Sequence, residues 1–312
     1  MKKKIISLIV LTASFIIIFH DIDINLLINS FKYFTFNNII LLIIGIMISF
    51  IIISHRWYFI NGGEISFKAS LESTIISLGI NNILPARMGE ISKLLYLQKI
   101  YGYPTFKSLP LTVIERLFDL IGIASIGLFT ALFMDKIQQY IIPFYFVLML
   151  FLFFLILLIK NPIYFVKLGK RIKSRKIKRY LLKVIGTFNR LNQMYFIKLV
   201  IMSVIIWAYY IVLMFLFVNS PSEINITFIE AATIFVISAI GVSLPSSPGA
   251  IGVYEASIVL GMGWFGIEKE FALSFAILYH FTQIIITSIL AFLIMYLKDF
   301  KVQKNAPSME NR

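Results

Sequence analysis

The sequence predicts an all-α, polytopic membrane protein with one integral membrane domain over residues 1–312. Three observations lead to this prediction: 59% of the 312 residues are apolar, only 14% are charged, and the mean hydropathy is +0.90. Soluble domains are about 45–50% apolar and about 25% charged, so a soluble globular protein is excluded. Several apolar stretches also approach the roughly 20 residues that a helix needs to cross a bilayer core.

Six apolar stretches are predicted to span the membrane: 5–19, 38–54, 109–134, 137–159, 199–218 and 271–297. The first follows basic residues 2–4 and lacks a small-residue cleavage site, which favours an uncleaved helix over a signal peptide. Residues 24–36 are mixed in polarity, and we expect them to lie at the interface. The second span is followed by Arg56 and Trp57, a basic and aromatic edge typical of a cytoplasmic boundary.

A basic loop orients the predicted spans. Between Lys160 and Arg190 there are eleven Lys and Arg and no acidic residue, within a chain of net charge +14. Such a loop stays in the cytoplasm and lies against anionic headgroups, so we expect 160–195 to be cytoplasmic. Six crossings then place both termini there, in a multi-pass protein of the cell membrane. Nucleic acid is not an expected partner, because aromatic platforms and a folded basic domain are missing.

Two further segments, 69–100 and 230–266, are apolar but broken by proline and glycine. The termini and the basic loop can all lie in the cytoplasm only if each of these segments enters and leaves the membrane on one side, or if each crosses it twice. In the first case, the earlier segment opens to the cytoplasm and the later one to the outside. Inverted repeats with broken helices around a midplane site have this pattern. Few residues match between the two segments. Leu84-Pro85 and Gly89-Glu90 of the first segment correspond to Leu244-Pro245, Gly252 and Glu255 of the second.

The second break has features suited to an anion. Ser247 is a candidate N-cap, and Pro248 suits the first helical position. Gly249 and Gly252 permit close approach of another backbone or a headgroup. A helix that begins there would point N–H groups and its positive dipole end at a phosphate. The alternatives are a simple kink or a packing surface of small residues.

Charged residues inside the apolar segments are the other candidates. Glu115 and Asp119 share a helix face and repel unless a cation intervenes, whereas Arg116 points elsewhere. Each charge at mid-bilayer costs about 2.5–3.5 kcal/mol on insertion scales. The charges therefore either lie at the cytoplasmic mouth or pair internally with Arg87 or Lys93, and we prefer an internal network with Arg87.

Arg87 and Glu90 lie three residues apart, and two interpretations stay open. They form a local ion pair, or Arg87 binds a phosphate while Glu90 orients it. His280 lies alone in the last span and is expected to be a packed or hydrogen-bonded helix residue rather than a proton relay.

The motifs resemble a known family. They are Asn82-x-x-Pro85-x-Arg87-x-Gly89-Glu90, Glu115-Arg116-x-x-Asp119 and Leu244-Pro245-x-x-Pro248-Gly249-x-x-Gly252-x-x-Glu255. In order, spacing and membrane context, they resemble the lysylphosphatidylglycerol synthase transmembrane domain family, also called flippase-like domain proteins. In bifunctional members this domain is associated with moving aminoacylated phosphatidylglycerol, which a separate soluble domain makes from aminoacyl-tRNA. The present sequence ends at Arg312, and we do not expect it to make that lipid itself.

The resemblance implies a lipid flippase or translocator that moves an anionic or lipid-linked headgroup between leaflets through a polar cavity. The expected substrate-binding residues are Asn82, Arg87, Glu90, Glu115, Arg116, Asp119, Ser247, Gly249, Gly252 and Glu255. Arg87 and Arg116 would receive the headgroup. We expect no catalytic residue, metal or cofactor: there is no cysteine, the three histidines are far apart, and a nucleotide-binding loop is missing.

Other functions and partners stay open. One is a membrane-embedded transferase with Glu90, Glu115 or Asp119 as acid or base. Another is an accessory protein that presents a lipid-linked substrate to a second enzyme. Beyond a membrane lipid, the open partners are another copy of the chain and a separate lipid-modifying enzyme.

Overall fold

The computed structural model describes residues 12, 14–16, 18, 20–84, 88–133, 143, 146–154, 157, 182, 186, 193–221, 224–243 and 247–304. All regular structure in these ranges is helical, which confirms the predicted all-α class. The helices are α2 (Ile24–Phe31), α3 (Phe36–Ile60), α4 (Phe67–Ile83), α5 (Met88–Tyr101), α6 (Thr105–Leu132), α10 (Gln193–Val218), α11 (Phe228–Ser243), the 3-10 turn η1 (Pro248–Ala250), α12 (Val253–Gly263) and α13 (Lys269–Lys304).

Three of the described helices, α3, α10 and α13, are long and apolar enough to cross a membrane. They confirm the predicted spans 38–54, 199–218 and 271–297. Helix α6 covers the predicted span 109–134 as 28 residues, but it is not among the three and contains Glu115, Arg116 and Asp119. The predicted spans 5–19 and 137–159 lie largely outside the described residues.

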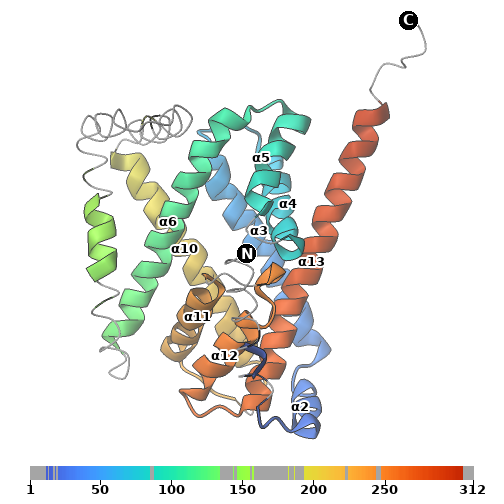
Figure 1. The fold of residues 1–312 in the computed structure, drawn as a ribbon, viewed down its shortest axis with the longest axis vertical. Coiled ribbons are helices and arrows are strands. Elements are labelled where there is room, and N and C mark those ends of the chain that lie inside the picture. The colour runs from blue at the N-terminus through green and yellow to red at the C-terminus, as the bar shows by residue number, and fades with distance from the viewer. Residues whose placement is uncertain are drawn as a thin grey trace, which may run out of the picture.

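The two broken segments form helical hairpins that enter the molecule from opposite ends (Figure 1). In Figure 1, α4 and α5 occupy the upper half, and α11 and α12 the lower half. These four helices have 17, 14, 16 and 11 residues, fewer than the roughly 20 that a span needs. Each of these helices alone is therefore short for a complete crossing, which favours re-entrant hairpins over double crossings.

The helices occur twice in the same order. A long helix, a short helix, a break, a short helix and a long helix appear first as α3 to α6 and again as α10 to α13. Because the two hairpins open at opposite ends, this order supports the predicted inverted repeat.

Close backbone contacts shape the first hairpin. The Asn81 Oδ1 atom accepts a hydrogen bond of 2.8 Å from the Gly89 N–H, which joins the end of α4 to the start of α5. A Cβ atom at Gly89 would lie 1.9 Å from the Ser77 carbonyl oxygen, so only glycine fits there. Gly79 packs equally closely on α13, where a Cβ would lie 2.4 Å from the Ala291 Cβ atom.

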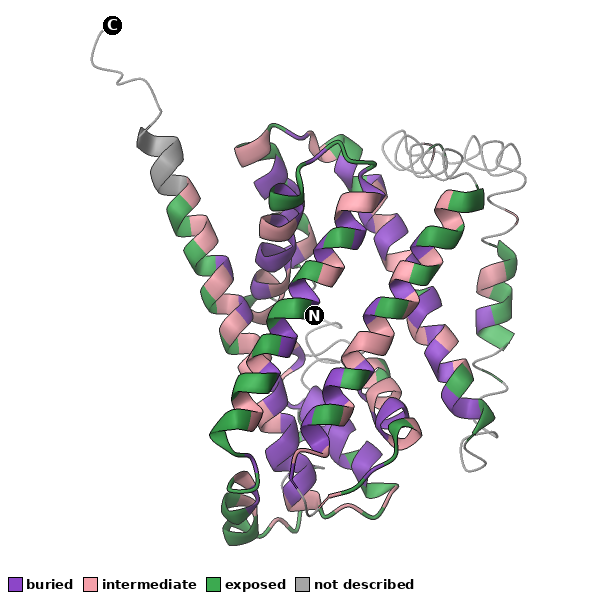
Figure 2. Ribbon diagram, turned by 180° about the vertical axis from the view of Figure 1, so that it is seen from behind, coloured by how far each residue is buried: buried purple, intermediate pink, exposed green. Residues whose placement is uncertain are grey.

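The buried side chains form several clusters, and the two largest each contain residues from both halves of the chain. One contains Trp57, Leu97 and Phe118 from α3, α5 and α6. Another contains Phe217 and Phe275 from α10 and α13, together with other apolar residues. Figure 2 shows buried residues facing the interior and exposed ones along the outer helix faces. Many of the exposed side chains are large and apolar, as expected for surfaces that contact lipid.

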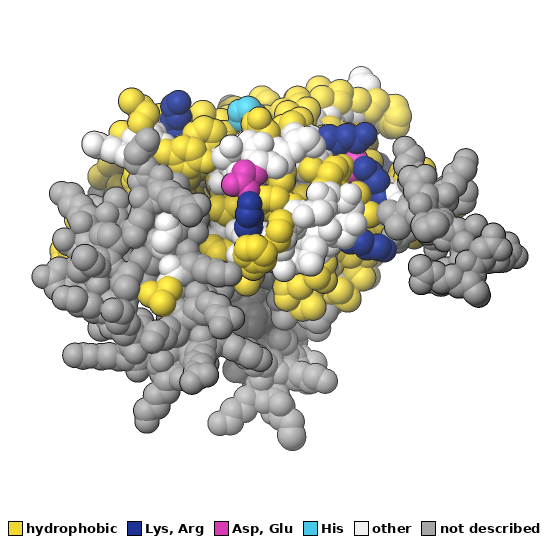
Figure 3. Space-filling model, turned by 90° about the horizontal axis from the view of Figure 1, so that it is seen from above, with side chains coloured by type: hydrophobic (Ala, Val, Ile, Leu, Met, Phe, Trp, Pro, Cys, Tyr) yellow, Lys and Arg dark blue, Asp and Glu magenta, His cyan; other side chains and the backbone are white. Residues whose placement is uncertain are grey.

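The end of the molecule with the loops 61–66 and 102–104 carries basic side chains among hydrophobic ones (Figure 3). One of them, Lys107, forms an exposed ion pair of 3.0 Å with Glu64. Helix α2 lies near the opposite end, where Ile24, Leu26 and Ile28 are exposed. An amphipathic helix with such exposed apolar residues suits a membrane interface, in line with the expectation for 24–36.

Candidate functional site

The two breaks lie against each other. Gly249 of η1 packs on the backbone of Asn82 near the end of α4, and a Cβ atom at Gly249 would lie 3.3 Å from the Asn82 carbonyl oxygen. The Asn82 side chain reaches α13, where its Nδ2 lies 3.4 Å from the Ile284 carbonyl oxygen and 3.4 Å from the Ser288 Oγ atom. Two predicted site residues from distant parts of the sequence are thus in contact. The shared cavity expected between the breaks stays a prediction.

The second break differs from the expected helix start. Pro248–Ala250 is a 3-10 turn of three residues, and α12 begins only at Val253. Gly249 and Ala250 have φ angles of 64° and 55°, which stop a right-handed helix. Ser247 makes no side-chain cap, because its hydroxyl donates a 2.6 Å hydrogen bond to the Ile251 carbonyl. Ser247 thus lies at the N-cap position and Pro248 at the first position of the turn, as expected, but the predicted capping hydrogen bond of the Ser247 side chain is not formed.

Glu255 provides the cap instead. Its Oε2 atom accepts a hydrogen bond of 2.6 Å from the Gly252 N–H, at the start of α12. This contact corrects the expectation that the Gly252 N–H is free for a phosphate. A carboxylate one turn inside the helix satisfies the otherwise unpaired donor and suits the helix dipole.

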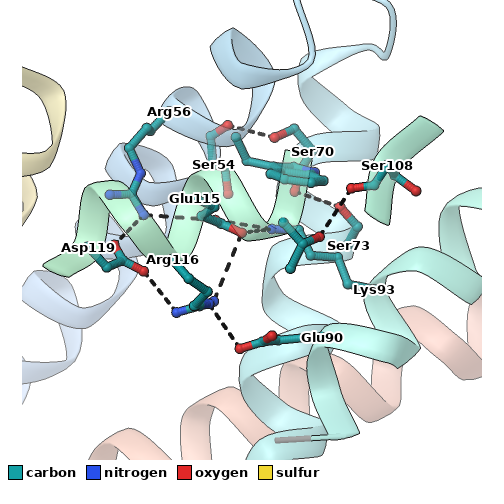
Figure 4. Close-up of polar contacts among 12 residues, drawn as sticks. Ser54, Arg56, Ser70, Ser73, Glu90, Lys93, Ser108, Glu115, Arg116 and Asp119 are labelled. Atoms are coloured by element: carbon teal, nitrogen blue, oxygen red, sulfur yellow. Dashed lines mark hydrogen bonds and ion pairs between the residues drawn. The ribbon is translucent and has the colours of Figure 1, made fainter. Parts of the chain in front are cut away.

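The charged residues of α5 and α6 form one network with α3 (Figure 4). Glu115 is buried, and its Oε2 atom lies 3.0 Å from the Lys93 Nζ atom. Lys93 also lies over the Trp57 ring, 3.5 Å from its centroid. Lys93 and Trp57 are both buried. These contacts confirm that the charges pair inside the protein, and the partner they show is Lys93, the alternative to the preferred Arg87.

The cation between Glu115 and Asp119 is Arg56, which the sequence analysis assigned to a cytoplasmic boundary. Its Nη2 atom lies 2.6 Å from Asp119 and 3.9 Å from Glu115, and its Nη1 donates to Ser203 of α10 over 2.9 Å. The side chain is only 2% exposed. Helix α3 continues to Ile60, so Arg56 lies within the helix and not beyond its end, while the cytoplasmic placement stays a prediction. The missed signal is that no glycine or proline follows the predicted span before Gly62.

Arg116 is the network member that is most open to the surroundings. Its side chain is 40% exposed, and its Nε atom lies 2.9 Å from Glu90, two residues into α5. It also lies 2.8 Å from Asp119, three residues further along α6. The expectation that Arg116 points away from Asp119 was wrong, since the long side chain turns back along the helix. Through Glu90, the network extends to the tip of the first hairpin.

The charges of the network balance among the described residues. Arg56, Lys93 and Arg116 are paired with Glu90, Glu115 and Asp119. Such balance is expected where charges are buried in an apolar environment. Arg87 lies outside the described residues, so its predicted contact with the carboxylates stays a prediction.

A comparison with protein-family models identifies the family. Residues 4–291 match the model described as the lysylphosphatidylglycerol synthase TM region. The chain belongs to this family. The match covers nearly the whole sequence and confirms the resemblance drawn from the motifs. Neither a curated protein nor a solved structure matches the chain. Family membership indicates a multi-pass membrane protein related to lipid metabolism or translocation.

Glu255 in this family member has a second contact that the sequence analysis did not anticipate. Its Oε1 atom lies 2.7 Å from the His280 Nδ1 atom on α13, and both side chains are buried. The His280 ring also packs on Tyr254, with centroids 4.3 Å apart. The interpretation of His280 as a packed, hydrogen-bonded residue is compatible with these contacts, but its partner is an ionisable side chain.

Eight of the ten predicted site residues thus fall into three groups. Glu90, Glu115, Arg116 and Asp119 belong to the charged network, and Asn82 and Gly249 form the contact between the hairpin tips. Gly252 and Glu255 are hydrogen-bonded to each other at the start of α12, in the second hairpin, and Glu255 also contacts His280. In the described part of the chain, no group of three or more His, Asp or Glu side chains is arranged to hold a metal ion.

Proposed function

We propose that this protein is a lipid translocator that moves an anionic or lipid-linked headgroup between leaflets while the hydrocarbon chains stay in the membrane. The observation that carries the proposal is the contact between Gly249 and Asn82. Two re-entrant hairpins from opposite ends meet there, as in transporters whose broken helices surround a midplane site. Irregular backbone at that depth is tolerated where it is buried in protein or lines a wet cavity.

The charged network supplies the polar chemistry in this proposal. Arg116 is the partly exposed cation, and its partners Glu90 and Asp119 hold its guanidinium in place. A planar guanidinium binds phosphate oxygens in pairs, which suits an anionic headgroup. Arg87, on the segment between α4 and α5, is expected to add a second cation.

We further propose that the protein lies in the cell membrane with its N-terminus, C-terminus and basic 160–195 loop in the cytoplasm. The charge distribution supports this orientation. The segments at the end of the molecule with α2 contain Asp21, Asp23, Glu230, Glu268 and Glu270, whereas their described lysines are Lys32 and Lys269. Depletion of basic residues is typical of the outer side.

The pairing of the carboxylates argues against the transferase alternative. Glu90, Glu115 and Asp119 each contact a cation within 3.0 Å. Ion pairing favours the charged form of a carboxylate and opposes its use as a general acid. The present geometry thus suits a binding site better than an acid–base pair.

A leaflet-resolved assay in liposomes tests the proposal. Purified protein is reconstituted without nucleotide, and fluorescent phosphatidylglycerol in each leaflet is distinguished by an impermeant quencher. We expect faster exchange than in protein-free vesicles, a loss in Arg116→Gln, and normal exchange in Lys107→Gln, whose charge lies in an exposed pair. Exchange no faster than in empty vesicles, for phosphatidylglycerol and for a polyprenyl phosphate, contradicts the proposal. Chemical conversion of the lipid would support the transferase instead.

A further inference from the structure

The carboxylates of the two halves have different counter-ions. In the first half, Glu115 and Asp119 are paired with lysine and arginine side chains. In the second half, Glu255 is 4% exposed, and its ionisable partner is His280, which is 8% exposed. No described Lys or Arg from any neighbouring helix forms an ion pair with Glu255. A histidine, unlike arginine, changes its charge near neutral pH.

The protonation of this pair decides the local charge. When Glu255 is ionised, the His280 Nδ1–H donates to its Oε1 atom, and the pair carries one negative charge. A proton that adds to the His280 Nε2 atom converts the ring to imidazolium and makes the pair neutral. An uncompensated charge away from water is costly, and neutralising it relieves that cost.

We propose that Glu255 and His280 form a proton-binding site that couples proton uptake to the position of the second hairpin tip. The coupling of this site to transport rests on the proposed translocation, which a proton gradient would drive. Proton binding itself does not depend on lipid transport. A proton is taken up at the His280 Nε2 atom from water on one side of the membrane and is released to water on the other.

The hydrogen bonds of Glu255 connect the proton to the tip. One carboxylate oxygen faces His280, and the other accepts the Gly252 N–H at the start of α12. The turn before Gly252 contains Gly249, which lies against Asn82 of the other hairpin. A change in charge at Glu255 therefore alters its hydrogen bond to Gly252, at the start of α12. Through the turn that precedes Gly252, it also affects the contact between Gly249 and Asn82.

The other titratable side chains around the pair are tyrosines. Tyr254 precedes Glu255 on α12, and Tyr279 precedes His280 on α13. From α10, Tyr209 and Tyr210 face Tyr279. From α4, the described residue against Gly249 is Asn82, which makes the contact through its backbone and has no titratable side chain. The proton is therefore assigned to the carboxylate and imidazole, because tyrosines stay neutral near neutral pH.

The histidine content allows a direct test. The chain has three histidines, His20, His55 and His280, so protein labelled with ¹⁵N-histidine shows few imidazole signals by NMR. His280→Gln removes one signal and identifies it, and His55→Gln is the matched control on the exposed face of α3. We expect the His280 signal of lipid-reconstituted protein to change reversibly between its neutral and doubly protonated forms as the buffer is acidified. A single protonation state over the whole pH range in which the protein stays folded would overturn the proposal.

The coupling is tested in the liposome assay. With a pH gradient of one unit across the membrane, we expect lipid exchange by the unmodified protein and by His55→Gln to change several-fold. His280→Gln should stay folded, since an amide still donates to Glu255, but lose the response to the gradient. A gradient response in His280→Gln equal to that of the unmodified protein overturns the coupling. If His280 titrates while no variant moves lipid, the proton site stands and the proposed function fails.

Discussion

Arg56 on α3 and Asp119 on α6 lie 63 residues apart in sequence, yet their side chains meet over 2.6 Å inside the molecule. The same guanidinium lies 3.9 Å from Glu115, so it separates two carboxylates of one helix face. Its other terminal nitrogen binds Ser203, which brings α10 into the same arrangement. Arg56 thus links three helices and offsets the repulsion expected between Glu115 and Asp119.

Arg56→Ala should destabilise the fold strongly. Removing one partner of a buried ion pair costs about 3–5 kcal/mol, because the remaining charge is left uncompensated. Thermal unfolding in detergent, followed by size-exclusion chromatography, measures the loss. The control is Lys107→Ala, which breaks an ion pair with both side chains about half exposed and should cost about 0–1 kcal/mol. Equal stability of the two variants would show that Arg56 is not a structural counter-ion.

Gly249→Ala should separate the two hairpin tips. The new methyl group would lie 3.3 Å from the Asn82 carbonyl oxygen, in addition to the strain of a φ angle of 64°. Gly62→Ala is a matched control, since Gly62 has a φ of 62° and no atom within 4 Å of a new Cβ. Each substitution carries a left-handed backbone cost of about 1–2 kcal/mol.

Lipid exchange in reconstituted vesicles should therefore fall at least several-fold in Gly249→Ala and stay near normal in Gly62→Ala. The two variants should have similar folded yields if the backbone cost dominates stability. Full exchange activity in Gly249→Ala would contradict a functional role of the tip contact.

Arg116→Lys should impair transport although it keeps the charge. The guanidinium contacts Glu90 through Nε and Asp119 through Nη1, which one ammonium group cannot reproduce with the same geometry. Since the side chain is 40% exposed, we expect little loss of stability. The ratio of exchange rate to folded protein, compared among the unmodified protein, Arg116→Lys and Arg116→Gln, separates the two effects. A rate in Arg116→Lys equal to that of the unmodified protein would indicate that charge alone is sufficient.

The two hairpins should open to opposite sides of the membrane. The chain has no cysteine, so Lys68→Cys at the start of α4 and Glu268→Cys before α13 can each be labelled alone. With the basic loop in the cytoplasm, an impermeant thiol reagent added outside intact cells should label position 268 and leave position 68 unlabelled. The reverse pattern would invert the proposed orientation. Labelling of both positions from one side would contradict the opposed hairpins.

The amino-acid sequence by itself determined the class of the protein and the places where its membrane helices break. Apolar content and span length predicted an all-α membrane protein, and the three described helices that are long and apolar enough to cross a membrane coincide with predicted spans. The proline and glycine residues marked both re-entrant segments, because they end helices wherever the chain folds. The motif order indicated the family, and the cost of buried charge predicted an internal paired network, for which Lys93, the partner of Glu115, was one of two candidate cations.

Only the tertiary structure decided which partners complete these features. Arg56 joins the charged network and His280 pairs with Glu255 because the rotation of α3 and α13 turns them inward, and helical spacing within one segment does not set that rotation. The positive φ angles at Gly249 and Ala250 moved the start of α12 to Val253, so Glu255 caps the helix in place of Ser247. The contact of Gly249 with Asn82 joins residues far apart in sequence. It exists because two hairpins, each too short to cross, end at the same depth in the molecule.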